Sequence, residues 1–231
     1  MSEGAIFLNS GPLFSGEQLA SLEERPEWSG LDEAARTAYE VVKETFERHS
    51  TLLAGNPSVE ETRFHMVTPT LHTLGFTHSA FEPLSLGSEG GLIRVDYACF
   101  ANAEEFGASV DARETVGFFR NALTVVRAVG WGQNLDNAVD NADGSTDVRP
   151  AMELDLIMRH TGVRYGILTN GCDWRLYHHS TSGTLTTYFH ADMIAAMKSD
   201  FEDFKTFYLI FNKHALTVDK MGRCFLDSLI G

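Results

Sequence analysis

Apolar residues recur at intervals of three and four over residues 31–49, and acidic residues occupy the opposite positions. This period predicts an amphipathic helix that lays one face on a core. A shorter helix is predicted over 16–24, because Ser15 and Gln18 have the spacing of a capping box and Pro26 disfavours continuation. By pattern, the chain therefore begins with helices.

The next helical segment starts at a second capping box, which Ser58 and Glu61 form. Apolar positions at helical spacing continue from there to Gly75, a residue typical of helix C-termini. Pro69 lies inside this segment and lacks the N–H that a helix interior uses. A kink is therefore predicted at Pro69.

After this segment the period changes from that of helices to that of strands. Short runs rich in β-branched and aromatic residues, bounded by glycine or polar residues, predict buried strands. An Asn-Gly pair within 169–173 predicts a hairpin between two of them. The predicted strands cover residues 92–100, 122–129, 163–168, 174–179 and 185–189.

Polar and glycine-rich segments connect these strands. Residues 101–120 are predicted as a surface insertion, 87–91 as a hairpin turn, and 130–149 as a loop that is a candidate mobile lid. Further helices are predicted over 150–162, 192–211 and 219–229.

Helices, then a mixed sheet, then helices again predict an α/β fold. We expect an N-terminal helical extension over 1–57, a core over 58–190, and C-terminal helices over 191–231 that are a candidate linker to a downstream domain. A chain of 231 residues, 43% of them hydrophobic, is large enough to bury a core without disulfides or a structural metal.

Acidic residues outnumber basic ones by 32 to 18, which gives a net charge of −14. The acid excess is strongest over 1–60, whereas 161–231 carries equal numbers of both signs. A protein that holds nucleic acid by counterion release needs a basic face. We therefore expect any contact with DNA to be weak and to depend on other domains.

The three cysteines have no CxxC spacing, which predicts reduced thiols rather than disulfides. Apolar runs fall short of the ~20 residues that a membrane helix needs. The first residues also lack the basic start of a signal peptide. These features predict a cytoplasmic protein without a membrane partner.

The segment 162–177 reads GVRYGILTNGCDWRLY. It resembles a hairpin in the N-terminal nuclease-like domain of type I motor subunits and type IIG restriction enzymes, which belong to the PD-(D/E)XK superfamily. Other segments resemble family motifs and follow the family's order. They are PTLHTLGF at 69–76, VDYACF at 95–100, VVRAVGWGQNLD at 125–136, FYLIFNKHAL at 207–216 and CFLDSLIG at 224–231.

The resemblance extends over 58–231 and implies a restriction-endonuclease-like mixed sheet flanked by helices. It also implies a chemistry, in which an Asp on the second strand and the Glu of an ExK motif on the third hold Mg²⁺ for phosphodiester hydrolysis. The Lys of ExK lies on the same side of its strand and stabilises developing charge. A Glu on the preceding helix and a Gln-x-x-x-Tyr on the following helix support the site.

By this resemblance, Asp96 corresponds to the metal-binding Asp, and Glu61 or Glu60 to the helical Glu. The two charged positions of ExK read Arg127 and Val129, so the carboxylate and the lysine are both replaced. A guanidinium stays protonated at physiological pH. We expect Arg127 to fold onto Asp96 as an internal ion pair that takes the place of the cation.

The first position of the Gln-x-x-x-Tyr motif reads Glu153. One interpretation is a further loss, and the other is migration of the missing acid onto this helix, for which Glu153 and Asp155 are candidates. There is no lysine between Lys43 and Lys198. An active site built from relocated groups therefore needs a distant lysine or an arginine in its place.

Three functions remain open at this point. The first is a catalytically inactive nuclease-fold domain, without a cofactor, that acts as a docking or DNA-proximity module and has a protein partner in a restriction or phage-defence complex. The second is an active Mg²⁺-dependent restriction endonuclease domain with a rearranged site. The third is an oligomerisation module, for which an exposed apolar patch on the last two helices is the cue.

Overall fold

The structure is a computed structural model and describes residues 5–85, 92–137 and 149–230. Seven strands of the described chain form one mixed sheet in the order β1-β7-β6-β5-β4-β3-β2. β4 and β5 are parallel, and the other neighbouring pairs are antiparallel. The strands are β1 (Phe7–Ser10), β2 (His78–Ser85), β3 (Leu92–Phe100), β4 (Ala122–Ala128), β5 (Tyr165–Thr169), β6 (Asp173–His178) and β7 (Tyr188–Asp192).

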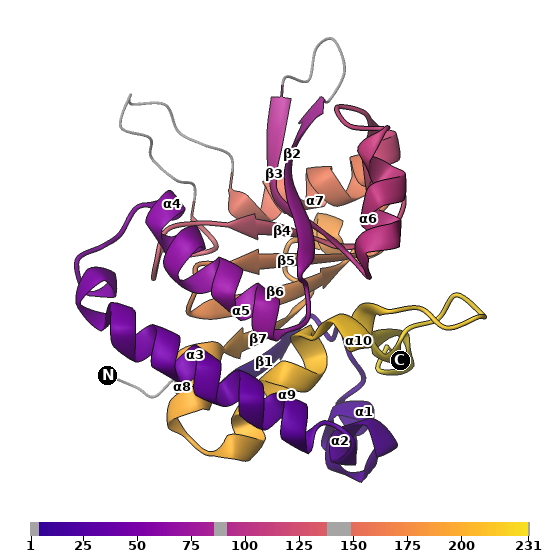
Figure 1. The fold of residues 1–231 in the computed structure, drawn as a ribbon. Coiled ribbons are helices and arrows are strands. Elements are labelled where there is room, and N and C mark those ends of the chain that lie inside the picture. The colour runs from indigo at the N-terminus through magenta and orange to yellow at the C-terminus, as the bar shows by residue number, and fades with distance from the viewer. Residues whose placement is uncertain (1–4, 86–91, 138–148, 231) are drawn as a thin grey trace.

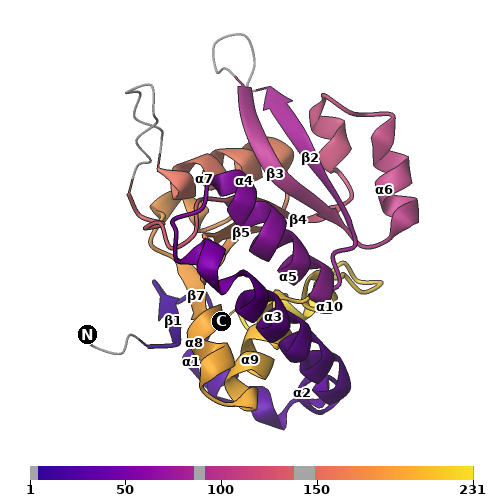
Figure 2. The ribbon, with the colours of Figure 1, turned by 60° about the vertical axis from the view of Figure 1, so that its left-hand side comes forward.

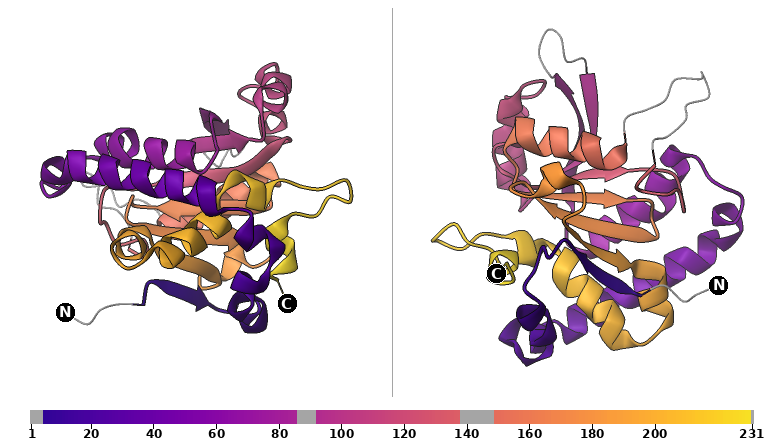
Figure 3. Two further views of the ribbon diagram at one scale, coloured as in Figure 1. Left: turned by 60° about the horizontal axis from the view of Figure 1, so that its bottom comes forward. Right: turned by 180° about the vertical axis from the view of Figure 1, so that it is seen from behind.

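Helices cover both faces of this sheet. α3, α5 and α9 lie on the near face in Figure 1, and α7 lies on the opposite face, which Figure 3 shows from behind. Figure 2 shows α3 running alongside α5 and α9. The helices are α1 (Gly16–Ala20), α2 (Pro26–Ser29), α3 (Asp32–Leu53), α4 (Val59–Thr62), α5 (Thr68–Thr73), α6 (Ala103–Val110), α7 (Pro150–Thr161), α8 (Met193–Lys198), α9 (Phe201–Phe211) and α10 (Lys213–Leu216).

Each face of the sheet has its own apolar core. On β4, Val126 and Ala128 belong to the cluster under α3 and α9, whereas Val125 and the following Val129 belong to the cluster under α7. Successive strand side chains point to opposite faces, so one strand contributes to both cores. A mixed sheet with helices on both faces confirms the predicted fold class.

Several predicted elements are confirmed. β3 covers 92–100 as predicted, and α3 extends the predicted helix 31–49 to Leu53. β5 and β6 form the predicted hairpin. α7 begins at Pro150 and ends at Thr161, and the next residue, Gly162, has a positive φ of 73° that suits a residue without a side chain.

The N-terminal pattern was wrong in two respects. Ser15 forms no capping box: its N–H donates to the carbonyl oxygen of Leu229, and the side chain of Gln18 accepts a hydrogen bond from Arg25. α1 ends at Ala20 before a 3₁₀ turn. Pro26 opens the short helix α2, where its fixed φ is favourable. Residues 7–10 add a strand that was not predicted, and this strand pairs with β7.

The C-terminal pattern also differs. The predicted helix 192–211 is two helices, since Asp200 caps α9, and the predicted helix 219–229 is absent from the described residues. There, the Asp219 carboxylate accepts the N–H groups of Met221 and Arg223, which diverts them from helical bonds. Only a 3₁₀ turn at Phe225–Ser228 follows.

The last predicted strand lies three residues later than expected, at Tyr188–Asp192, because Ser182–Thr184 forms a 3₁₀ turn and Leu185 has a φ of 59°. The insertion 101–120 contains α6 and a 3₁₀ helix at Val116–Phe119. The predicted turn 87–91 and most of the predicted lid lie outside the described residues. Within the described ranges, every helix is too short or too polar to span a lipid bilayer.

Candidate functional site

Asp96 lies where the pairing of β3 with β4 ends. The backbone pairing runs from Phe100 to Tyr97, and the next residue, Asp96, uses its side chain instead. Its Oδ2 accepts the N–H of Ala128 on β4 at 2.8 Å. A register shift against β2 gives β3 an extra residue here, and such a bulge re-aims side chains. The carboxylate of Asp96 therefore takes the place of a backbone carbonyl as the acceptor for the last residue of β4.

Arg127 lies against Asp96, as the sequence led us to expect. Its Nη1 donates to Asp96 Oδ2 and to the carbonyl oxygen of Ala128, both at 2.8 Å. Its Nε donates to Oε2 of Glu153 at 2.5 Å. Glu153 is in the first turn of α7, which Pro150 starts. One guanidinium thus bridges two carboxylates from different elements.

A second arginine, Arg63, completes the group. Its Nη1 lies 3.2 Å from Oδ1 of Asp96, and its guanidinium stacks over the rings of Phe81 and Tyr97. We define Arg63, Asp96, Arg127 and Glu153 as the Asp96 cluster.

The sequence analysis missed Arg63. It begins a π-helical segment, Arg63–Val67, between α4 and α5. Pro69 has no N–H to donate to the carbonyl of His65, so the predicted kink takes the form of a widened turn. The preceding Thr62 is buried and accepts the N–H of Trp131 at 2.9 Å, which ties this helix to the loop after β4. The one feature of the sequence that indicated an irregular helix here, and hence a changed position of Arg63, was Pro69.

The Asp96 cluster is electrically balanced and mostly shielded from water. The side chain of Asp96 is 4% exposed, and those of its partners are 17–22% exposed. Burial by itself lowers the pKa of Arg127, but the nearby carboxylates of Asp96 and Glu153 outweigh it, so the pKa is raised. Arg127 is therefore a permanent cation between two acids.

The residues of this cluster do not fit a divalent cation. Arg63 occupies Oδ1 of Asp96, while Arg127 and the Ala128 N–H occupy Oδ2. A cation would have to displace a charged donor before it reached that carboxylate. In the described ranges, no three His, Cys, Asp or Glu side chains come together as a metal site.

The other predicted site residues serve the fold. Val129 is 1% exposed within the apolar core under α7, and its N–H donates to Thr169. Glu61 caps α4: its Oε2 accepts the N–H of Ser58 at 2.8 Å, and hydrogen bonds from Ser58 lower the pKa of Glu61. Asp155 pairs with Arg159. The structure thus joins Asp96, Arg127 and Glu153, while Glu61 is used as a cap.

The chain is therefore an α/β protein with a network of mutually paired charges where the pairing of β3 with β4 ends. Comparison of the chain with family models, with curated proteins and with solved structures found no match in any of the three.

Proposed function

We propose that the chain is a nuclease-fold domain that no longer cleaves, and that it acts as a docking or DNA-proximity module in a restriction or phage-defence system. The observation that carries the proposal is Arg127, which lies between the carboxylates of Asp96 and Glu153. In a metal-dependent nuclease of the resembled family, a divalent cation would lie between such carboxylates.

The size of the electrostatic change supports loss of catalysis. One unit charge at about 4 Å contributes about 4 kcal/mol at an effective dielectric near 20. Exchanging a carboxylate for a guanidinium at position 127 alters the local charge by two units, from attraction to repulsion of a cation. Arg63 adds a second positive charge on the other oxygen of Asp96.

The charge of the chain supports a role beside DNA rather than a strong grip on it. The net charge is −14, and phosphate contacts require cations. The isolated chain should therefore leave the mobility of a short DNA duplex unchanged at physiological salt. A tight complex would contradict this part of the proposal.

The decisive experiment is Mn²⁺ titration by calorimetry together with a plasmid nicking assay in Mg²⁺ and in Mn²⁺. The wild-type chain should show neither saturable binding nor cleavage. Arg127→Glu should acquire Mn²⁺ binding, because three carboxylates then face one another, and Asp96→Asn in that background should abolish it. Mg²⁺-dependent nicking by the wild type that Asp96→Ala abolishes would establish the active alternative instead.

A further inference from the structure

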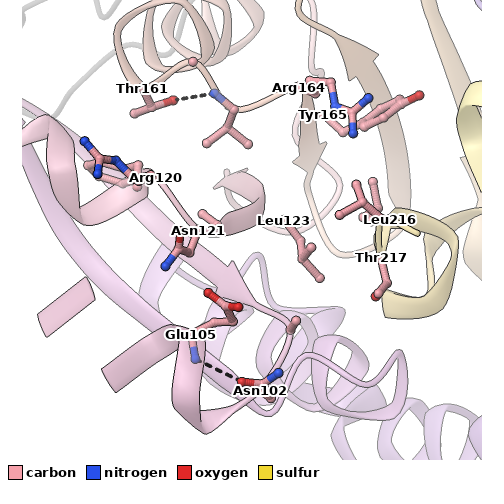
Figure 4. A pocket seen from close by; sticks show the side chains of 16 residues that line it. Asn102, Glu105, Arg120, Asn121, Leu123, Thr161, Arg164, Tyr165, Leu216 and Thr217 are labelled. Atoms are coloured by element: carbon pink, nitrogen blue, oxygen red, sulfur yellow. Dashed lines mark hydrogen bonds between the residues drawn. The ribbon is translucent and has the colours of Figure 1, made fainter. Parts of the chain in front are cut away.

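A cavity of about 510 Å³ lies at the end of β3 and β4 opposite the Asp96 cluster. α6, the start of β4 and the residues after α7 and α10 contribute to its wall (Figure 4). Figure 4 shows Arg120 and Arg164 on opposite sides of it. Asp227 pairs with Arg164, and Glu105 adds a carboxylate to the wall. The charges around this cavity balance, so it selects no class of ligand. The edge of the sheet is a more specific surface.

β1 is an edge strand, so one side of its backbone has no neighbouring strand. Figure 2 shows it beside β7 at the margin of the molecule. The carbonyl oxygen of Ile6 accepts an N–H of β7, and Leu8 pairs with β7 in the same phase. The backbone N–H and C=O groups of the alternate residues, Phe7 and Asn9, therefore point away from β7. These outward groups make no hydrogen bond within residues 5–85, 92–137 and 149–230.

This edge is also uncharged. Residues 5–16 contain no Asp, Glu, Lys or Arg, although the net charge of the chain is −14. The other edge strand, β2, has an inward-pointing Glu82, a proline at position 83 and a register shift after Ala80. Charge, proline and bulges protect natural edge strands from pairing with another chain. β1 has none of these, so two copies of this acidic protein can meet there without opposing like charges.

A second copy of β1 satisfies the outward groups of the first. When two such strands run antiparallel about a two-fold axis at Leu8, Phe7 of each copy lies opposite Asn9 of the other. Each of these pairs then exchanges both of its N–H···O bonds. The two Leu8 side chains stand directly opposite each other on one face, with their Cβ atoms about 5 Å apart. Leu8 is 50% exposed in the single chain, so this contact removes apolar surface from water.

We propose that the chain forms a two-fold dimer in which β1 pairs antiparallel with β1 of a second copy. The two seven-stranded sheets then become one continuous sheet. A few backbone hydrogen bonds and one apolar pair make a small interface, so the dissociation constant should be on the order of 100 µM. The inference is independent of the proposed function, because β1 shares no residue with the Asp96 cluster.

The test is sedimentation equilibrium of the full chain between about 5 µM and about 1 mM, over which the wild type should pass from monomer to dimer. Leu8→Lys places like charges directly opposite each other and should weaken the dimer at least about tenfold. The matched control is Val41→Lys, which adds the same charge at a 39% exposed position of α3 and should leave the dimer unchanged. Circular dichroism confirms that each variant is folded.

A charge-swap experiment tests whether residue 8 faces its own copy. Leu8→Glu alone should weaken the dimer as Leu8→Lys does, because like charges again oppose each other. An equal mixture of the two variants should associate nearly as well as the wild type, since opposite charges then lie across the two-fold axis.

Amide hydrogen exchange tests the backbone pairing itself. At about 1 mM chain the N–H groups of Phe7 and Asn9 should exchange severalfold more slowly than at about 10 µM. The N–H groups of Leu8 and Ser10 already face β7 in the single chain and should change little.

Four outcomes would overturn the proposal. A chain that stays monomeric at about 1 mM removes the dimer, and equal association of Leu8→Lys and Val41→Lys removes Leu8 from the interface. A mixture of the Leu8→Lys and Leu8→Glu variants that does not associate excludes the two-fold axis at residue 8. Dimerisation without slower exchange at Phe7 and Asn9 excludes strand pairing. None of these bears on Mn²⁺ binding or nicking, so the two proposals fail separately.

Discussion

An arginine lies at each end of the pairing between β3 and β4, and the two arginines differ in their partners. At one end, Arg127 has two carboxylates and a carbonyl oxygen as partners. At the other, the side chain of Arg120 is exposed and has no polar partner in the described part of the chain. Among the described residues, the same side chain type is thus fully paired at one end and unpaired at the other. Its role depends on what the fold places beside it.

The strongest test of this contrast is Arg127→Ala. It leaves Asp96 with fewer partners and Glu153 without its guanidinium in a site shielded from water. Removing one member of a buried ion pair strands the other charge, so the free energy of unfolding should fall by about 3 kcal/mol. Urea denaturation measures this loss.

The matched control for this prediction is Arg48→Ala. Arg48 pairs with Glu44 on the surface of α3, where their side chains are 64% and 70% exposed. Such pairs contribute about 0.5 kcal/mol or less. Equal losses in the two variants would mean that the Asp96 cluster behaves as a surface salt bridge.

The second prediction concerns Asp227, which pairs with Arg164 in the wall of the cavity. Asp227 also accepts hydrogen bonds from the Tyr165 hydroxyl and the Cys224 N–H. Asp227→Asn weakens three charge-assisted bonds, so stability at pH 7 should fall by about 2 kcal/mol. Chemical denaturation at several pH values measures it.

This second effect should depend on pH in a definite direction. Burial raises the pKa of Asp227, but hydrogen bonds from Cys224 and Tyr165, together with Arg164, outweigh it and lower the pKa. A carboxyl whose pKa is lower in the folded state stabilises the fold above its unfolded pKa, and this contribution disappears as pH falls through the folded pKa. The gap between wild type and Asp227→Asn should therefore shrink in acid. A gap that widens in acid would contradict this assignment.

The third prediction separates charge from hydrogen bonding at the Asp96 cluster. Glu153→Gln retains an oxygen that accepts from Arg127 but removes the negative charge. The loss should be about 1 kcal/mol, the difference between a charge-assisted and a neutral hydrogen bond. Thermal or urea unfolding checks the value. A loss as large as that of Arg127→Ala would show that the charge of Glu153 carries the whole cluster.

The smallest effect is expected for Arg120→Ala. An exposed arginine without a partner in the described chain contributes little to folding, so stability should change by less than about 0.5 kcal/mol. A loss above about 1 kcal/mol would show that Arg120 has a structural role, and the contrast between the two ends would then disappear.

Part of the Asp96 cluster was visible in the sequence. Asp96 and Arg127 lie in predicted strands, and the resemblance placed them at opposed positions, so their contact was expected. Glu153 was named as a candidate because it lies one turn into a predicted helix. Local patterns placed these residues in strands and a helix, and the resemblance predicted the contact between Asp96 and Arg127.

The role of Arg63 and the presence of the cavity could not be predicted from local patterns. Arg63 reaches Asp96 because a π-helical segment replaces the regular turns that the capping pattern predicts. The cavity is formed by residues from five separate segments of the chain. No local pattern indicates which distant segments meet. The two strands that the sequence analysis did not predict, β1 and β2, are the two edge strands of the sheet.

The hydrophobic period along the chain indicated an α/β protein, and the residue identities alone determined that position 127 carries a permanent cation and that no lysine stands at position 129. The tertiary structure alone decided which oxygens surround that cation and that Arg63 takes the other side of Asp96. It also decided that Arg120 lines a cavity and that its side chain has no partner among the described residues. The physical reason is the separation along the chain over which each interaction acts. Backbone propensity and hydrophobic period act over a few neighbouring residues. Charge pairing and cavity shape depend on residues that only the packed fold brings together.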